Sequence, residues 1–341
     1  MNMGYDVVKF LPSVQQQLAA EKEKLESQLE GSIKAKSRKI GQTLTKLPPK
    51  GIPGDEIIQL MSAVTHDENV MWQNGKASGA VYHGGRQHQD LLNQAFNLYS
   101  IANPLHPDIW PSGMKYESEL LAMTASLMSS LPLSETDICG STTSGGTESI
   151  VLATKAHRDY YRDRYGITQP EVVACVSAHA AIDKACDLLG IRLIKVPMDP
   201  ITFKCDLQAM EWAIGPNTIM LYSSAPQFPQ GVIDDISAIS ALAVKYNVGQ
   251  HVDCCLGGFI LPFAKKLGYD IPGVCVLVCV IVCVCVLYVF LYCYFIISHH
   301  IEVYVTYHLT HHMLLRILYF SDYHHNHIMI GHGICTLVII L

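Results

Sequence analysis

Short apolar runs alternate with amphipathic segments over residues 140–255. Four of these runs have the length and the unbroken hydrophobicity of strands buried on both faces. They cover residues 172–176, 191–196, 218–222 and 248–252. Helical spacing of apolar positions fills the rest, at residues 150–161, 180–189, 206–214 and 235–246. This alternation predicts an α/β domain with a mainly parallel sheet, flanked by helices and joined by right-handed crossovers.

Helices and polar loops dominate the pattern of the first 135 residues. Apolar side chains at helical intervals among alternating Glu and Lys predict an amphipathic helix over residues 13–39. They are Leu18, Leu25, Leu29 and Ile33. We expect this stripe to dock on its own domain, although a partner or a membrane surface is an alternative. Further helices are predicted over residues 55–64 and 117–129, and loops over the glycine- and proline-rich residues 72–88 and 103–108.

Composition and charge divide the chain again. Of the 24 basic and 30 acidic side chains, residues 274–341 hold only Glu302, Arg316 and Asp322. We therefore expect four parts: a helix and linker (1–60), a loop and helix region of the active site (61–135), a ligand-binding domain (136–273) and an apolar tail (274–341). The net charge of −6 excludes a basic footprint, so nucleic acid is not an expected partner. The cysteines before the tail follow no secretory signal, which favours reduced thiols in a cytosolic environment.

A glycine-rich turn, Gly-Ser-Thr-Thr-Ser-Gly-Gly-Thr-Glu-Ser over residues 140–149, opens into the first helix of the domain. Small residues let a ligand approach the backbone, and the N–H groups of a helix start bind anions. Gly145, Gly146 and Thr147 are therefore candidate phosphate-binding residues. No lysine follows the glycines as in nucleotide-triphosphate loops. The alternative is an ordinary helix capped by Ser144 or Thr147.

Polar residues stand where the predicted strands end. His179 follows the first strand, Ser224 the third and Asp253 the fourth. Ligands of parallel α/β sheets bind beyond the carboxyl ends of the strands, so these residues are expected to converge with the phosphate-binding turn. A phosphate site, an imidazole and a carboxylate suit a phosphorylated pyridine cofactor, because the carboxylate keeps the ring nitrogen protonated. Taken singly, His179 could cap the next helix and Asp253 could begin a turn.

The loops add three candidates for ligand contact, Tyr82, Asn103 and His106. Each taken alone is equally an ordinary turn or surface residue.

These motifs together resemble a known family. Thr-Ser-Gly-Gly-Thr-Glu-Ser (143–149), Ser-Ala-His-Ala-Ala (177–181), Pro-Gln-Phe-Pro-Gln-Gly (226–231) and His-Val-Asp-Cys-Cys-Leu-Gly-Gly (251–258) are similar to those of the group II pyridoxal-phosphate decarboxylase superfamily. Ser-Gly-Ala-Val-Tyr (78–82) and Asn-Pro-Leu-His-Pro-Asp (103–108) narrow the resemblance to the sphingosine-1-phosphate lyases. It covers roughly residues 40–272 and implies the pyridoxal-phosphate transferase fold of type I.

The resemblance also implies a reaction and roles for single residues. The reaction cleaves a phosphorylated sphingoid base to phosphoethanolamine and a fatty aldehyde, with pyridoxal 5′-phosphate as cofactor. Gly145, Gly146 and Thr147 would bind the cofactor phosphate, with Ser224 nearby. His179 would stack on the ring and Asp253 would pair with its nitrogen. Tyr82 and His106 would face the substrate across a homodimer with shared active sites. The implied location is the cytosolic face of the endoplasmic reticulum membrane, although the family's N-terminal anchor is not seen in this chain.

The chain departs from the family in three places. The Schiff-base lysine of the family follows the segment that ends near Pro272, but the last lysine here is Lys266. The small C-terminal domain is also not found, so we expect this chain to be inactive. Cys254 replaces a small Ala or Ser and adds a thiol near the ring. A non-catalytic partner subunit that lends Tyr82 and His106, and an amino-acid decarboxylase, remain as alternative functions.

The tail begins with a run that alternates Val and Cys and continues uncharged to residue 297. It is long enough to span a bilayer, which leaves membrane association open. We favour translated intron or a faulty gene model, because natural spans prefer Leu to a Val-Cys alternation. Its histidine pairs, at residues 299–300, 311–312 and 324–325, lack positioned second ligands, so no metal site is expected.

Overall fold

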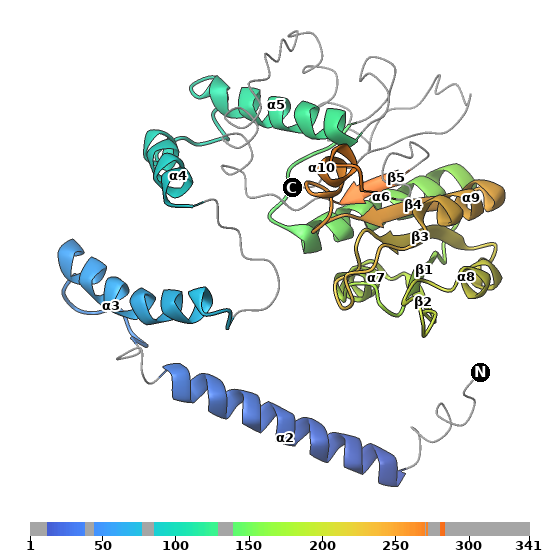
Figure 1. Cartoon of the computed structure of the whole chain (residues 1–341), viewed down its shortest axis with the longest axis horizontal. Coiled ribbons are helices and arrows are strands. Elements are labelled where there is room, and N and C mark those ends of the chain that lie inside the picture. The colour runs from blue at the N-terminus through green and yellow to red at the C-terminus, as the bar shows by residue number, and fades with distance from the viewer. Residues whose placement is uncertain are drawn as a thin grey trace. The chain divides into compact units, whose positions relative to one another are not determined.

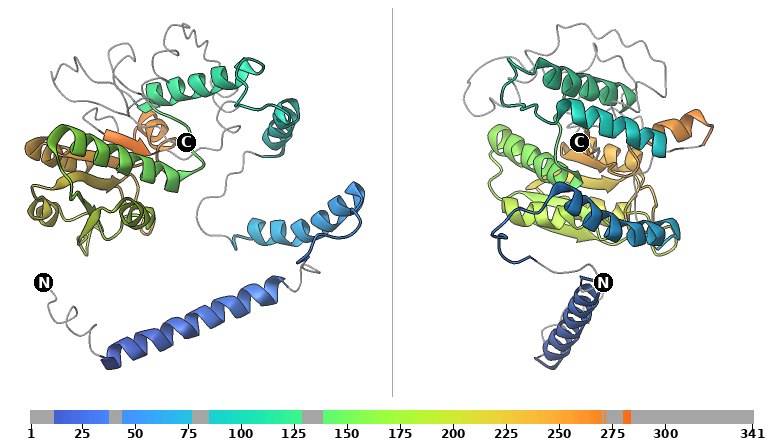
Figure 2. Two further views of the ribbon diagram at one scale, coloured as in Figure 1. Left: turned by 180° about the vertical axis from the view of Figure 1, so that it is seen from behind. Right: turned by 90° about the vertical axis from the view of Figure 1, so that its left-hand side faces the viewer.

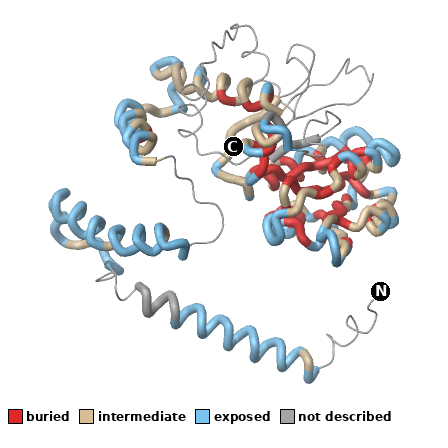
Figure 3. The backbone as a smooth tube through the Cα atoms, viewed as in Figure 1, coloured by how far each residue is buried: buried red, intermediate tan, exposed pale blue. Residues whose placement is uncertain are grey.

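The computed structural model describes residues 12–37, 44–76, 85–128, 139–269, 271 and 280–283. The chain divides into two compact units, Met1–Tyr82 and His83–Leu341. In the first unit, the predicted amphipathic helix is confirmed as α2 (Pro12–Ser37), and α3 (Gly54–Gln73) continues well beyond the predicted end at residue 64. Leu18, Leu25 and Leu29 of the α2 stripe are exposed, and none of the described residues of α3 is buried (Figure 3). Docking of the stripe stays a prediction.

The second unit contains one parallel sheet (Figure 1). Its strands are β1 (Glu171–Cys175), β2 (Arg192–Val196), β3 (Thr218–Ser224), β4 (Gly249–Asp253) and β5 (Val280–Cys283). All described pairs are parallel, in the order β2-β1-β3-β4-β5. The predicted α/β class and the four predicted strands are therefore confirmed. The fifth strand was not predicted, because its residues lie inside the apolar run that the sequence favours as aberrant or membrane-like.

Helices cover both faces of the sheet (Figure 2). Alternate residues of β1 show the division. Val172 and Ala174 pack with α6 (Gly146–Tyr165) and α7 (Ala181–Leu189), while Val173 and Cys175 pack with α8 (Leu207–Ala213) and α9 (Ile236–Tyr246). This two-sided burial explains why the strands have continuous apolar sequences. We call the first side the α6 face.

Local capping fixes the ends of the helices around the sheet. The carboxylates of Asp206 and Asp235 each accept a backbone N–H from the first turn, at 3.0 Å, and so begin α8 and α9. Gly166 and Gly190 adopt left-handed conformations after α6 and α7, which glycine does without steric cost. These caps keep the crossovers short and return the chain to the sheet.

In the second unit, α4 (Arg86–Tyr99) and α5 (Pro111–Met128) precede the sheet, and α10 (Leu261–Lys266) lies in the connection between β4 and β5. The predicted loop over residues 72–88 is wrong at both ends, because α3 extends to Gln73 and α4 begins at Arg86. The centre of this segment, residues 77–84, lies outside the described residues. The loop predicted over residues 103–108 is confirmed as irregular.

The direction of α6 follows from two contacts near its carboxyl end. The Tyr161 hydroxyl donates to the carbonyl oxygen of Asn247 at 3.1 Å, and His157 lies against Gly249, where an added Cβ would be 2.2 Å from the His157 Cδ2. Gly249 begins β4, so this half of α6 lies at the amino end of that strand. Gly146 is eleven residues earlier, or about 16 Å along a helix. Asp253 is four residues along β4, or about 13 Å. Gly146 and Asp253 therefore lie at the same, carboxyl, edge of the sheet.

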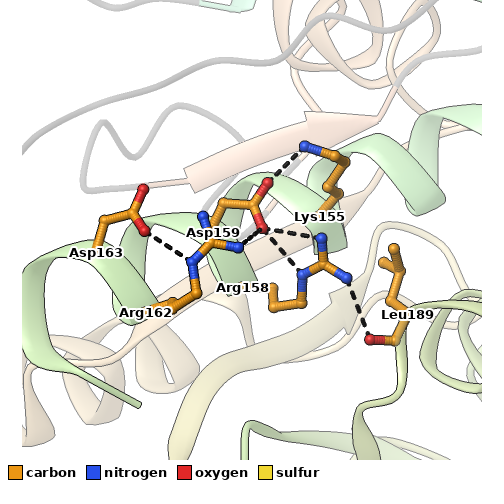
Figure 4. Close-up of polar contacts among 6 residues, drawn as sticks. All are labelled: Lys155, Arg158, Asp159, Arg162, Asp163 and Leu189. Carbon is orange, nitrogen blue, oxygen red and sulfur yellow. Dashed lines mark hydrogen bonds and ion pairs between the residues drawn. The ribbon is translucent and has the colours of Figure 1, made fainter. Parts of the chain in front are cut away.

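Charged side chains fasten the outer surface of α6 (Figure 4). Asp159 accepts from Lys155 at 2.5 Å, from Arg158 at 3.0 Å and from Arg162 at 3.0 Å. Burial raises the pKa of Asp159, but these cationic partners outweigh it and the pKa is lowered. Arg158 also donates to the carbonyl of Leu189 at 3.2 Å and so joins α6 to the end of α7. Partly exposed ion pairs of this kind contribute little to the free energy of unfolding, so their main effect is on the orientation of the helix.

Among the described residues, no helix is both long and apolar enough to cross a bilayer. Within the same part of the chain, no group of three or more His, Cys, Asp or Glu side chains is placed to hold a metal ion. The tail's histidine pairs, and its apolar run apart from β5, lie outside the described residues.

His157 makes the stability of the sheet unit depend on pH. Burial lowers its pKa from 6.5 to about 4, although its ring Nδ1 lies 2.9 Å from the Ala153 carbonyl oxygen. Between these values the unfolded chain binds a proton that the folded chain does not. The contribution is therefore complete above pH 6.5 and is lost as the pH falls toward 4. We expect the free energy of unfolding to decrease by about 2 kcal/mol between about pH 7.5 and about pH 5, measured by urea unfolding.

The variant His157→Gln should lose most of this pH dependence. The matched control is His66→Gln, which removes an exposed histidine of α3 and should keep the wild-type slope. Equal slopes for His157→Gln and the wild type would contradict the assignment.

Candidate functional site

The glycine-rich turn enters α6 without a side-chain cap. Gly145 occupies the N-cap position with φ 159° and ψ 176°, a conformation that L side chains rarely adopt. The predicted alternative, a helix capped by Ser144 or Thr147, is therefore wrong, because the N-cap residue is Gly145. The Ser144 N–H and hydroxyl instead donate to Glu148, at 2.7 and 2.6 Å, and lower its pKa. The first N–H groups of a helix have no intrahelical partner, so this end of α6 suits an anion.

The turn is held from both sides. Within it, the Thr143 hydroxyl lies 2.9 Å from the Ser149 hydroxyl, and the Ser149 hydroxyl donates to the Gly145 carbonyl at 3.1 Å. From α5, the Glu117 carboxylate accepts a hydrogen bond from the Thr142 hydroxyl. Gly145, Gly146 and Thr147 thus belong to a turn whose backbone is fixed before any ligand arrives. Their role in phosphate binding stays a prediction.

Asp253 is the last residue of β4 and is 7% exposed. Its Oδ2 accepts the Tyr222 hydroxyl at 2.6 Å, and its Oδ1 accepts the Cys255 N–H at 3.0 Å. Gly249, His251 and Asp253 alternate along β4, and Gly249 touches α6, so Asp253 lies on the α6 face. A carboxylate has about four acceptor positions, and these two bonds leave room for a further donor.

Ser224 ends β3 beside Asp253, its register partner. Its N–H donates to Asp234 Oδ2 at 2.9 Å, and its carbonyl accepts the Asp234 N–H at 3.1 Å. Asp234 Oδ1 accepts the Cys205 N–H at 3.0 Å. Burial raises the pKa of Asp234, against the opposing effect of the two N–H donors. Asp234 therefore fixes the backbone of the β3 end, and the Ser224 side chain is buried there.

His179 follows β1 and begins α7. Its Nδ1 accepts the Ala181 N–H at 3.1 Å, and its ring meets Phe228 edge-on, with centroids 5.2 Å apart. Its neighbours Ala178 and Ala181 belong to the apolar cluster of the α6 face. The capping role that the sequence left open is thus present, and the same contacts hold an exposed imidazole at the carboxyl edge. Whether it stacks on a cofactor stays a prediction.

The loop candidates have local contacts of their own, and their role toward a substrate stays a prediction. Asn103 Oδ1 accepts the Leu105 N–H at 3.0 Å, which makes it a turn residue. His106 is exposed and stands 6.3 Å from the Trp110 ring, between α4 and α5. The described residues do not bring either of them to the sheet edge. Tyr82 lies outside the described residues.

The thiol of Cys254 packs with Ala225, Ile236 and Leu261 in a separate apolar cluster. Burial raises the pKa of this thiol, and the charge of Asp253 raises it further, so the thiol is neutral at physiological pH. Its distance from the predicted ring stays a prediction.

Sequence analysis missed Tyr222 and Phe228. Tyr222 is part of an apolar strand run, and nothing in its spacing indicates a bond to a residue 31 positions away. Phe228 is inside a quoted motif, but its contact with His179 depends on how the loop after β3 folds back. Only the register of β3 and β4 could have suggested the first contact.

Comparisons with known proteins agree with this arrangement. A sphingosine-1-phosphate lyase of Dictyostelium discoideum is 44% identical over 265 residues, which is 78% of this chain and 48% of that protein. Sphingosine-1-phosphate lyase 1 of Rattus norvegicus is 47% identical over 225 residues, 66% of this chain and 38% of that protein. A solved sphingosine-1-phosphate lyase of Burkholderia pseudomallei superposes with a TM-score of 0.64 and 38% identity, over 67% of this chain and 53% of that one. No family model matches the chain.

Together, the parallel sheet flanked by helices and these relatives place the chain in the class of the pyridoxal-phosphate-dependent lyases and decarboxylases. Within this class the chain belongs to the sphingosine-1-phosphate lyase family. It spans about half the length of the curated relatives that it matches.

Close packing under Asp253 gives a prediction about the turn that follows it. A Cβ added at Gly257 would lie 2.0 Å from the Ala225 carbonyl oxygen, which is backbone and cannot move aside easily. We expect Gly257→Ala to lower the free energy of unfolding by about 1–3 kcal/mol, the usual cost of overpacking. Urea unfolding measures it.

Gly215→Ala is the matched control. Its added Cβ meets only Glu171 Oε2 at 3.5 Å, an ordinary contact. Equal stabilities of the two variants would show that the turn does not pack as described.

Proposed function

We propose that this chain supplies the pyridoxal-phosphate-binding part of a sphingosine-1-phosphate lyase. The observation that carries the proposal is the position of Asp253, buried and doubly hydrogen-bonded at the edge of the sheet where α6 begins. A carboxylate that is buried from water attracts a nearby cation, because the cation stabilises its charge. A protonated pyridine nitrogen is such a cation.

The residues present fit the non-covalent part of the cofactor. Gly145, Gly146 and Thr147 would hold its phosphate at the start of α6. Asp253 would accept the proton of the ring nitrogen, and His179 would cover the ring. When bound, pyridoxal phosphate supplies a ring that withdraws electrons from the bond to be broken. The protein's part is to bind, orient and keep that ring nitrogen protonated.

The covalent bond between the cofactor and a lysine does not fit these 341 residues. The last lysine is Lys266, before the position at which the family's Schiff-base lysine occurs. We therefore propose that residues 1–341 by themselves bind the cofactor reversibly and do not cleave substrate. Cleavage of a phosphorylated sphingoid base to phosphoethanolamine and a fatty aldehyde is proposed for the family's complete catalytic set.

A binding experiment tests the proposal. We expect the purified chain to bind pyridoxal 5′-phosphate in equilibrium dialysis, to lose it on further dialysis and, after borohydride, to show no stoichiometric adduct in mass spectrometry. Asp253→Asn should weaken binding at least about tenfold, because it removes a buried charge pair. The control Asp187→Asn changes an exposed acid of α7 and should bind like the wild type.

Two outcomes would count against the proposal. Unchanged binding by Asp253→Asn would remove the ring-nitrogen role. A stoichiometric adduct on one lysine would show that another lysine of the chain forms the covalent bond to the cofactor.

We also propose a homodimer, in which the loop over residues 103–108 completes the partner's site. Ile101, Leu105 and Ile109 flank His106 and are 80%, 83% and 59% exposed, an apolar surface of the kind that interfaces bury. With this function we propose that the protein is located at the cytosolic face of the endoplasmic reticulum membrane. The family resemblance supports this location.

Light scattering tests the assembly. We expect a mass of two chains for the wild type and of one chain for Leu105→Asp, because a buried charge opposes association. The control Leu188→Asp alters a side chain of α7 that is 69% exposed and should remain dimeric. A monomeric wild type would contradict the proposal.

A further inference from the structure

Tyr222 lies where its hydroxyl can act on the carboxylate of the proposed cofactor site. It is 1% exposed and packs in the apolar cluster between the sheet and α6. Its register partner on β4 is His251, and the next pair toward the carboxyl edge on this face is Ser224 with Asp253. The hydroxyl therefore reaches diagonally from β3 to the neighbouring strand β4, where it donates to Asp253 Oδ2 at 2.6 Å.

The two bonds to Asp253 come from different sources. The Cys255 N–H on Oδ1 belongs to the backbone turn after β4, and the geometry of the chain itself supplies it. The bond on Oδ2 depends on one side chain. Both donors favour the ionised form, because a hydrogen bond to a carboxylate is stronger when that carboxylate is charged.

The surroundings of Asp253 leave Tyr222 as the side chain that opposes burial. Around it the described residues place Tyr222 from β3, His251 on its own strand, and the turn residues Cys254 and Cys255. The Cys254 thiol is neutral, since burial and the charge of Asp253 raise its pKa, and it packs in another cluster. From α6, His157 lies against Gly249, at the opposite end of β4. On β5, Cys283 is the register partner of Asp253.

We propose that Tyr222 is a positioning residue for the cofactor ring, whose hydroxyl fixes the orientation of the Asp253 carboxylate. This inference rests on the proposed function, because it concerns the same site. Without the hydroxyl, the carboxylate keeps the Cys255 N–H on Oδ1, while Oδ2 loses the bond that holds it in place. A carboxylate that can turn presents its charge less well to the ring nitrogen.

The test uses the full 341-residue chain and pyridoxine 5′-phosphate, which has no aldehyde and cannot attach covalently. Its affinity is measured by isothermal titration calorimetry. We expect Tyr222→Phe to weaken binding about tenfold, the usual effect of losing a hydrogen bond to a charged group. The ultraviolet band of the bound ring, which differs between the protonated and the neutral nitrogen, should shift toward the neutral form in this variant.

Tyr161→Phe is the matched control. Tyr161 is 8% exposed, belongs to the same apolar cluster and donates its hydroxyl to a backbone carbonyl at the other end of the sheet. Loss of this hydroxyl costs stability in a comparable way but should leave the affinity and the ultraviolet band unchanged. A shift of equal size in both variants means that the effect is structural, and overturns the inference.

Two further variants keep the proposal falsifiable. If Tyr222→Phe does not fold, Tyr222→3-fluorotyrosine retains the ring and makes the hydroxyl a stronger donor, so the ultraviolet band should shift toward the protonated form. An unmoved band overturns the inference. Asp253→Asn separates the two claims: if it loses binding while Tyr222→Phe matches the wild type, only the role of Tyr222 is wrong. If Asp253→Asn binds normally, the proposed function fails and the inference fails with it.

Discussion

The parallel pairing of β3 with β4 is the constraint on which the site depends. Five register pairs bring Ser224 beside Asp253 and Tyr222 beside His251. Because side chains alternate between faces, the same register places Tyr222 and Asp253 together on the α6 face. A slip of one residue would turn Asp253 to the other face of the sheet, away from the Tyr222 hydroxyl. Strand register, rather than any local motif, therefore brings the two side chains together.

The close approach of α6 completes this arrangement. Gly249 lacks a side chain where His157 presses on β4, so the helix can lie directly on the strand that carries Asp253. The direction of the helix then brings its amino end, with Gly145 and Gly146, to the carboxyl edge. The helix N-terminus and the carboxylate offer opposite charges along one edge. That combination suits a ligand with an anionic tail and a cationic ring.

Two buried aspartates at this edge have different surroundings. Asp234 receives two backbone N–H groups, from Ser224 and Cys205, and ties the end of β3 to the segment before α8. Asp253 receives one backbone N–H and one hydroxyl, and lies on the face where α6 begins. The first is a structural acid in the backbone. The second retains acceptor capacity toward the edge.

The sequence by itself determined the sheet and the order of the residues along its edge. Short continuous apolar runs between helical segments favour strands covered on both faces, and a parallel sheet brings the carboxyl ends of its strands to one side, so the convergence of His179, Ser224 and Asp253 could be expected. It did not determine α4 or β5, because a glycine-rich flank and an apolar repeat favour other structures locally. Only the tertiary structure decided that Gly145 rather than a side chain caps α6, that Cys254 packs with Ala225 and Leu261, and that Tyr222 bonds to Asp253. Each of these depends on which strand lies beside which, and that is a property of packing between distant segments.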